Sequence, residues 1–170
     1  MHKVAESYID QIQSCKIPYD VKIRNVDFKI QSHDVYPPGK LTELFINFLI
    51  EQDIIRERII VDVGAASFAL GIIAVLNGAK KAIGIDINKK AVECAKQNIS
   101  IHNVSSKAEI LHGEIKQLYQ LFQNKVDVLV AGLPWDSMSL NEFYNINPKR
   151  KLLSRAFYDV NDSLINSLLT

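Results

Sequence analysis

The most constraining feature of the sequence is the stretch 61–71, Val-Asp-Val-Gly-Ala-Ala-Ser-Phe-Ala-Leu-Gly, which is followed by a second apolar run over 82–86. This order predicts a strand, a tight turn at Gly64, a helix, and a second strand that ends in Asp86. Gly64 permits a chain reversal where a Cβ would clash, and the start of the helix offers unpaired N–H groups. Asp86 can accept hydrogen bonds from both hydroxyls of a ribose. The stretch therefore predicts an α/β nucleotide pocket and an adenosine-bearing cofactor.

Residues that are missing from this stretch narrow the class of cofactor. A dinucleotide site needs G-x-G-x-x-G, but Ala66 and Phe68 stand where further glycines are expected, and the sequence has no Gly-Lys-Ser/Thr of a P-loop. A nucleotide-dependent oxidoreductase is thereby disfavoured. Downstream, a third apolar run ends in Gly113 and Glu114, and a fourth run, over 126–132, is followed within two residues by a Pro-Trp pair.

Together these motifs resemble, in family order from about Val35 to the C-terminus, the class I S-adenosylmethionine-dependent methyltransferases. The resemblance is closest to the amino-methylating subgroup with an Asn-Pro-Pro-Tyr-type motif, which includes glutamine methyltransferases and N-methyltransferases of RNA bases. It implies S-adenosyl-L-methionine as the cofactor. By this resemblance, the residues that contact the cofactor are Asp62, Gly64, Ala65, Ala66, Asp86, Ile87, Gly113 and Glu114.

The resemblance also implies where the reaction takes place. The residues in the place of the Asn/Asp-Pro-Pro-Tyr/Phe/Trp motif are Gly132, Leu133, Pro134 and Trp135. Because Gly132 replaces the side chain that holds the target amine, only the carbonyls of Gly132 and Leu133 remain as acceptors. Trp135 is expected to stack on a planar substrate group, with plain core packing as the alternative. Tyr36, in a Val-Tyr-Pro-Pro lead-in over 35–38, is expected to close the pocket or to be buried in that turn.

Several of these residues also have a structural interpretation. Phe68 and Leu70 would serve equally well to pack the first helix on the sheet. Asp62 would orient the loop or meet the methionine amino group of the cofactor. Asp86 and Glu114 both precede predicted helices, where an acid often acts only as a cap or dipole partner.

The order of the predicted elements gives the fold class. Strands are predicted near 59–63, 82–86, 108–111 and 126–131, and helices near 69–77, 88–102, 114–123 and 154–169, with Asn88 as a helix cap. Strands that alternate with helices predict a Rossmann-like α/β fold with a mostly parallel sheet and helices on both faces. An N-terminal helix over 4–12, a hairpin of 21–24 and 26–30, and a helix over 42–52 precede this core. We expect a single methyltransferase-like domain over 1–170, with a cap and lead-in at 1–40 and the cofactor-binding core at 41–170.

The end of the chain bears on its partners. By the resemblance, the strand order is 3-2-1-4, and the last strands of the family fold are absent before Thr170. The apolar run 126–131 would then lie at an open edge, which is an aggregation liability. We expect self-association, a partner over this edge, or a chain that is a fragment.

Composition excludes few functions. The 170 residues include 20 Lys and Arg against 19 Asp and Glu, a net charge of +1, so no global field attracts a polyanion. A short basic cluster over 149–155 is typical of a solvated loop. The two cysteines and four histidines lack ligand spacing, so no metal is expected, and no apolar run suggests a membrane span or a signal peptide. A cytoplasmic protein is the expectation.

Two functions remain open from the sequence. The first is an S-adenosylmethionine-dependent methyltransferase that acts on an amino or amide nitrogen of a protein, an RNA or a small molecule. The second is a non-catalytic relative that binds the cofactor or a partner, which the missing glycines and Gly132 favour.

Overall fold

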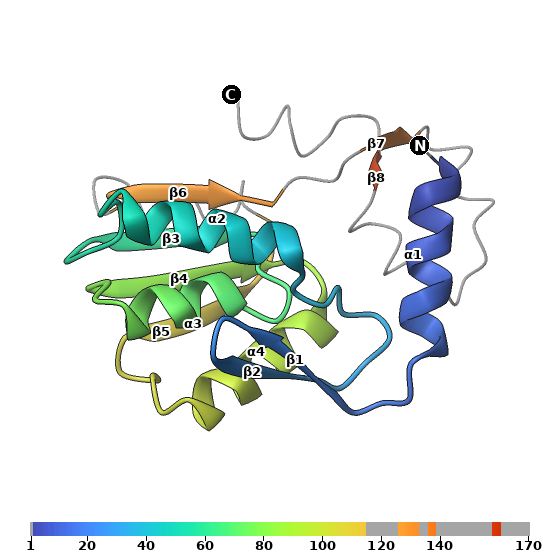
Figure 1. Ribbon diagram of the computed structural model, residues 1–170, viewed down its shortest axis with the longest axis horizontal. Helices are drawn as coiled ribbons and strands as arrows, with labels where there is room; N and C mark the ends of the chain where they lie inside the picture. The colour runs from blue at the N-terminus through green and yellow to red at the C-terminus, as the bar shows by residue number, and fades with distance from the viewer. Residues whose placement is uncertain (1, 115–125, 133–135, 139–157, 161–170) are drawn as a thin grey trace.

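The computed structural model describes residues 2–114, 126–132, 136–138 and 158–160 (Figure 1). Its helices are α1 (His2–Ser14), α2 (Lys40–Glu51), α3 (Ala69–Leu76) and α4 (Lys89–Ile101). Its strands are β1 (Tyr19–Ile23), β2 (Val26–Ile30), β3 (Ile59–Val63), β4 (Lys81–Asp86), β5 (Ala108–His112), β6 (Val128–Ala131), β7 (Asp136–Met138) and β8 (Tyr158–Val160).

The centre of the molecule is a parallel sheet of four strands in the order β5-β4-β3-β6. The helix α3 connects β3 to β4, and α4 connects β4 to β5, as crossover connections between parallel strands require. This confirms the predicted strand order and the Rossmann-like α/β class. Because the strands are parallel, β3, β4, β5 and β6 end at one edge of the sheet, where the predicted site residues lie.

The described helices of the core pack on one face of this sheet. A single apolar cluster joins residues of α2, α3 and α4 to one side of the strands, including Ile46, Leu70, Val92 and Ile110. The opposite side forms a separate cluster of strand residues centred on Val61, Val63, Ile83 and Ile85. The helix that was predicted over 114–123 for the second face lies outside the described residues, apart from Glu114.

The N-terminal elements agree with their prediction. Strands β1 and β2 form an antiparallel hairpin in which Tyr19 pairs with Ile30 and Ile23 with Val26. The hairpin lies beside α4, and the N-terminal helix α1 stands apart from the main sheet (Figure 1). Ile30 and Val35 pack with Ala91 and Cys94 of α4, which fixes the hairpin and lead-in to the core.

At the other end of the sheet, β6 is the edge strand among the described strands of the main sheet. Leu129 of β6 is 57% exposed. The separate pair β7 and β8 corrects one prediction. A helix was predicted over 154–169, but Tyr158–Val160 form β8, parallel to β7; tyrosine and valine favour strands when a partner strand is present. The rest of that predicted helix lies outside the described residues.

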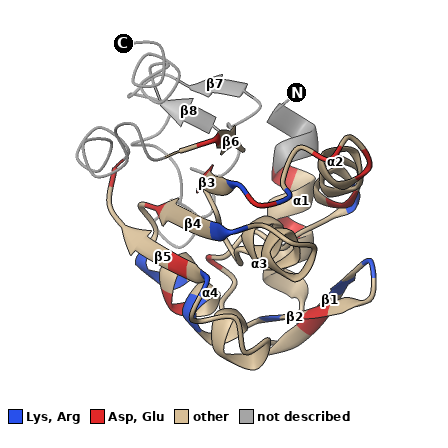
Figure 2. Ribbon diagram, turned by 90° about the vertical axis from the view of Figure 1, so that its left-hand side faces the viewer, with Lys and Arg blue, Asp and Glu red and all other residues tan. Residues whose placement is uncertain are grey.

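Charges of both signs are scattered over the described surface (Figure 2), consistent with the net charge of +1 for the whole sequence. Among the described residues, no helix is long and apolar enough to cross a membrane.

Candidate functional site

Asp86 ends β4 and is held in place by backbone donors. The N–H of Ala66 donates to its Oδ2 at 2.8 Å, and the N–H of Asn88 donates to its Oδ1 at 2.8 Å. Burial raises the pKa of Asp86, while these two hydrogen bonds, a third backbone bond from Ile87 and the nearby His112 oppose the rise. The carboxylate therefore has a fixed orientation against the loop that follows β3.

That loop begins with the tight turn predicted at Gly64. The N–H groups of Gly64 and Ala65 both donate to the carbonyl of Ile85, at 2.9 and 3.2 Å. Gly64 has a φ of +76°, and a Cβ there would lie 3.1 Å from the carbonyl oxygen of Gly132. Glycine is needed at this position for both reasons.

The next two positions of interest, Ala66 and Phe68, adopt the backbone conformation that glycine favours. Their φ angles are 48° and 62°, in the left-handed region. For a residue with a Cβ this conformation costs about 1–2 kcal/mol. Such strain persists only where the surroundings impose it. The sequence departs from glycine here, and the loop still takes a glycine-like path.

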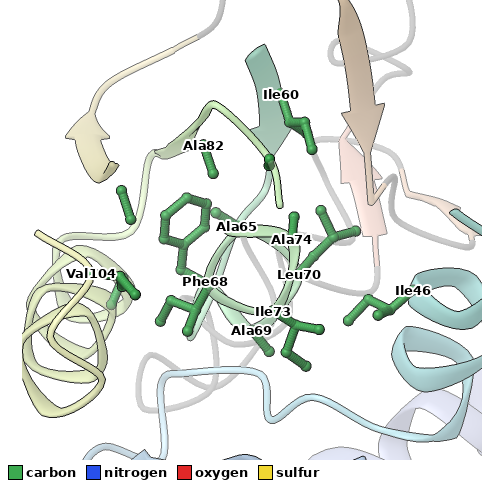
Figure 3. Packing of buried hydrophobic residues seen from close by; sticks show 14 of the residues in the cluster. Ile46, Ile60, Ala65, Phe68, Ala69, Leu70, Ile73, Ala74, Ala82 and Val104 are labelled. Carbon is green, nitrogen blue, oxygen red and sulfur yellow. The ribbon is translucent and has the colours of Figure 1, made fainter. Parts of the chain in front are cut away.

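The packing of the Phe68 ring holds the backbone at a position where the sequence analysis expected a glycine. Its side chain is fully buried in the main core, beside Ala82 and Val104 (Figure 3). The ring lies against the backbone of two glycines: a Cβ on Gly71 would collide with it, and a Cβ on Gly84 would lie 2.8 Å from its Cε2. This confirms the core interpretation of Phe68, and Leu70, at 8% exposed, is also core.

Asp62, two residues before the turn, is buried and has no partner among the described residues. It is 6% exposed, and no described residue forms a hydrogen bond or ion pair with its carboxyl group. Burial, with a smaller contribution from the charge of Asp86, raises the pKa of Asp62 to about 7. A buried carboxyl that lacks a partner is costly, so a cationic or hydrogen-bond-donating ligand would stabilise its charged form.

A third segment, after β5, completes this edge of the sheet. The N–H of Gly113 donates to the Asp86 carbonyl at 3.0 Å, and Glu114 follows with an exposed side chain. Ile87 is 39% exposed beside Asp86, which leaves an apolar surface at the site. The sequence analysis did not identify His112 as a residue of this site. In the structure His112 pairs with Asp86 in register, and its Nε2 lies 3.0 Å from the Ile87 carbonyl oxygen. Its position at the end of a strand beside an acid-bearing strand was the available signal.

The lead-in reaches the same edge through Asn88. The Asn88 side chain donates from Nδ2 to the Asp34 carbonyl at 2.6 Å, and its Oδ1 caps α4 by accepting from the Lys90 N–H. Tyr36, two residues after Asp34, is half-buried. Burial raises the pKa of its hydroxyl group, and the nearby Tyr8 raises it further. The structure thus fixes the lead-in to the start of α4 at Asp34, two residues before Tyr36.

Gly132 lies just past β6, next to the turn. Its N–H donates to the Val63 carbonyl at 3.1 Å, and Gly132 itself is exposed. Leu133, Pro134 and Trp135 lie outside the described residues. The structure therefore brings together Asp62, Gly64, Ala65, Ala66, Asp86, Ile87, Gly113, Glu114 and Gly132 around one edge of the sheet.

The sequence of residues 40–134, more than half of the chain, matches the family of ribosomal protein L11 methyltransferases (PrmA). The chain belongs to this family. The assignment confirms the predicted class, that of S-adenosylmethionine-dependent methyltransferases.

Individual relatives cover different parts of the chain. A ribosomal protein L11 methyltransferase of Clostridium perfringens is 38% identical over 72 residues, which is 42% of this chain and 22% of that protein. A Methanocaldococcus jannaschii protein with the provisional name protein N5-glutamine methyltransferase is 24% identical over 149 residues, 82% of this chain and 71% of that protein. The chain thus matches about a fifth of the length of its L11 methyltransferase relatives.

Solved structures agree on the fold. The SAM-dependent methyltransferase from Agrobacterium tumefaciens superposes with a TM-score of 0.54 at 15% identity, over 74% of this chain and 41% of that chain. A Pyrococcus horikoshii protein described provisionally as an RNA methyltransferase gives a TM-score of 0.52 at 20% identity, over 77% of this chain and 58% of that chain.

Proposed function

We propose that this chain binds S-adenosyl-L-methionine at the carboxyl edge of β3, β4 and β5 and transfers its methyl group to an amino or amide nitrogen. The observation that carries the proposal is Asp86. Both of its carboxylate oxygens are fixed by backbone N–H groups at 2.8 Å. With the further bond from Ile87, at least one of the about four acceptor positions of a carboxylate stays open for another donor. A carboxylate fixed in this way can accept a ribose hydroxyl without reorganising.

The neighbouring residues suit the other parts of the cofactor. Ile87 offers an exposed apolar surface to the adenine ring, and Glu114 offers an exposed carboxylate to its exocyclic amine. Asp62 is a buried carboxyl that lacks a partner within the described part of the chain, and the ammonium group of the methionine moiety would supply one. Gly64 lets the loop after β3 approach the backbone of Gly132 closely, because a Cβ at Gly64 would crowd the Gly132 carbonyl oxygen.

Methyl transfer asks the protein for position more than for acid–base groups. When bound, the cofactor supplies an electrophilic methyl group on a sulfonium. The protein must hold a nitrogen lone pair about 3–3.5 Å from that carbon, in line with the bond that breaks, and must exclude water. The carbonyl oxygens of Gly132 and Leu133 would accept hydrogen bonds from the N–H groups of the substrate nitrogen that receives the methyl group, and Trp135 would stack on the substrate.

The names of relatives support a nitrogen acceptor. They include a protein arginine N-methyltransferase of Saccharomyces cerevisiae, 30% identical over 80 residues, as well as the L11 and N5-glutamine enzymes. These names support our proposal that the chain is of the amino-methylating subgroup, with 132–135 in the position of the Asn-Pro-Pro-Tyr-type motif and a protein, RNA or small molecule as acceptor.

The first test is cofactor binding by calorimetry. Asp86→Ala should weaken S-adenosylmethionine binding at least tenfold, because a hydrogen bond to a charged group contributes about 1.5–3 kcal/mol. Glu114→Gln, on an exposed side chain, should weaken it less, and Asp20→Ala on β1, an exposed acid, should leave it unchanged. Equal affinity in Asp86→Ala and the unchanged protein would refute this site.

The second test is transfer of a labelled methyl group to an amide or an aromatic amine. Gly132→Asn should raise the rate, because one aimed hydrogen bond in a transition state is worth about 10²–10³-fold. Trp135→Ala should lower it. If both variants bind cofactor and neither changes transfer, the loop is not the active site and the chain is a non-catalytic cofactor-binding relative.

A further inference from the structure

The segment 65–68 contains two residues with a strained backbone, and the buried side chain of Asn98 forms a hydrogen bond with it. Ala66 and Phe68, both in the left-handed region, flank Ser67, which is 2% exposed. The carbonyl of Ser67 accepts a hydrogen bond at 3.3 Å from Nδ2 of Asn98 in α4. Asn98 is fully buried, and this contact joins residues 31 positions apart in the chain.

Asn98 also joins the N-terminal hairpin to the core. Its Oδ1 accepts from the Lys29 N–H at 2.9 Å, and its Nδ2 donates to the Lys29 carbonyl at 3.2 Å. The side-chain amide thus acts toward β2 as the peptide group of a neighbouring strand would. Because Nδ2 carries two protons, it can donate to Lys29 and to Ser67 at the same time.

The restraint matters because the loop is strained. A glycine-rich loop would adopt the same path at little cost, whereas Ala66 and Phe68 need external contacts to hold it. Three such contacts are on the loop itself: Ala66 N–H to Asp86, the Phe68 ring on Gly71 and Gly84, and Ser67 to Asn98. Asn98 alone among these also binds the hairpin.

We propose that Asn98 is a positioning residue for cofactor binding, which holds the strained loop 65–68 in its binding conformation through Ser67 and couples it to the hairpin through Lys29. This inference rests on the proposed function. Asn98 does not touch the cofactor in this proposal; it acts through the backbone of the loop that carries the Ala66 N–H bound to Asp86.

The test uses the full chain with Asn98→Ala and a control of similar destabilisation, Ile99→Ala. Ile99 is the next residue of α4, is 5% exposed, and packs in the main core. Both variants are compared in conditions where they are fully folded by circular dichroism. Asn98→Ala should weaken S-adenosylmethionine binding at least fivefold, and Ile99→Ala should leave it within twofold.

Two further measurements separate positioning from stability. Amide hydrogen exchange of Ala66 and Phe68 without cofactor should be at least tenfold faster in Asn98→Ala than in Ile99→Ala. Adding Ala66→Gly to Asn98→Ala should restore part of the affinity, because the glycine removes strain that Asn98 opposes. A general loss of stability would not be rescued in this way.

The outcomes are distinct. If the unchanged protein does not bind S-adenosylmethionine, the proposed function fails, and the exchange measurement still tests the restraint. If the unchanged protein binds and Asn98→Ala matches Ile99→Ala in affinity and in loop exchange, the positioning role is refuted.

Discussion

The loop after β3 and the loop after β6 meet at the carboxyl edge of the sheet, where the Gly132 N–H donates to Val63 at 3.1 Å. Each departs from the family pattern at a residue that matters. In the first loop Ala66 and Phe68 stand where the sequence resemblance implies glycines, and in the second loop, under the proposed function, Gly132 stands where the motif has Asn or Asp. The first loop is fixed by Asp86, Asn98 and two facing glycines. Gly132 is exposed and has no side chain.

The difference shows which kind of departure a fold can absorb. A lost glycine is a loss of backbone freedom, and packing can impose the same backbone path if space is made for the new side chain. A lost side chain is a loss of a chemical group, and backbone packing cannot restore an aimed hydrogen bond. The first departure is therefore compensated, and the second changes the chemistry that the loop can offer.

The largest expected effect comes from breaking the packing that compensates the first loop. Phe68→Ala should lower the free energy of unfolding by about 3–5 kcal/mol, because it empties a fully buried site. Gly71→Ala should lower it by about 1–3 kcal/mol, because the new Cβ collides with the Phe68 ring. Urea unfolding of both variants measures these losses.

The double variant makes this prediction specific to the contact. With the ring removed, the Gly71 methyl group enters free space, so Phe68→Ala with Gly71→Ala should be more stable than the two single losses imply by at least about 1 kcal/mol. Strict additivity of the two losses would contradict the contact between the ring and Gly71.

A second prediction concerns the strand that carries the first loop. The pKa of Asp62 is raised to about 7 in the folded protein from an ordinary value of 3.8, so the folded state keeps a proton that the unfolded state has lost. Stability should therefore fall as pH rises from about 4 to about 7, by up to about 4 kcal/mol in total. Asp62→Asn should reduce this slope and leave the part that the raised pKa of Asp86 contributes.

The matched control for Asp62→Asn is Asp20→Asn, since Asp20 is exposed and forms a surface ion pair with Lys29. Chemical unfolding between pH 4 and pH 8 should show the same slope in this control as in the unchanged protein. A slope that is as steep in Asp62→Asn as in the unchanged protein would assign the titration to another group.

The point where the two loops meet gives a smaller effect. Gly64→Ala should cost about 1–3 kcal/mol, because φ is +76° and the new Cβ would lie 3.1 Å from the Gly132 carbonyl oxygen. Gly132→Ala should change stability by less than about 0.5 kcal/mol, because its Cβ would have the Gly64 oxygen at 3.9 Å as its nearest contact. Equal costs would mean that the loops do not approach each other as described.

The smallest expected effect tests the strain itself. Ala66→Gly should raise stability by less than about 1 kcal/mol, since relief of the left-handed conformation is partly offset by the entropy of glycine in the unfolded chain. Ala65→Gly, at a residue outside the left-handed region, should instead lower stability by about 0.5–1 kcal/mol. Thermal unfolding compares the two, and a loss in both variants would show that Ala66 is not strained.

The sequence by itself determined the order of the elements and the edge at which the site lies. Apolar runs that end in Gly64, Asp86 and Gly113, separated by helical segments, allow only a parallel sheet, and parallel strands end at one edge. The cap at Asn88 was also readable, because a cap is a contact between residues two positions apart. These features depend on local patterns and on general rules for connections.

Only the tertiary structure decided how the loop is held. The side chain of Asn98 joins Ser67 and Lys29 over separations of 31 and 69 residues. The left-handed conformation of Phe68 depends on two glycines that make room for its ring, and the raised pKa of Asp62 depends on its burial and on the nearby charge of Asp86. Such contacts arise when distant segments pack together, and no local pattern in the chain encodes them.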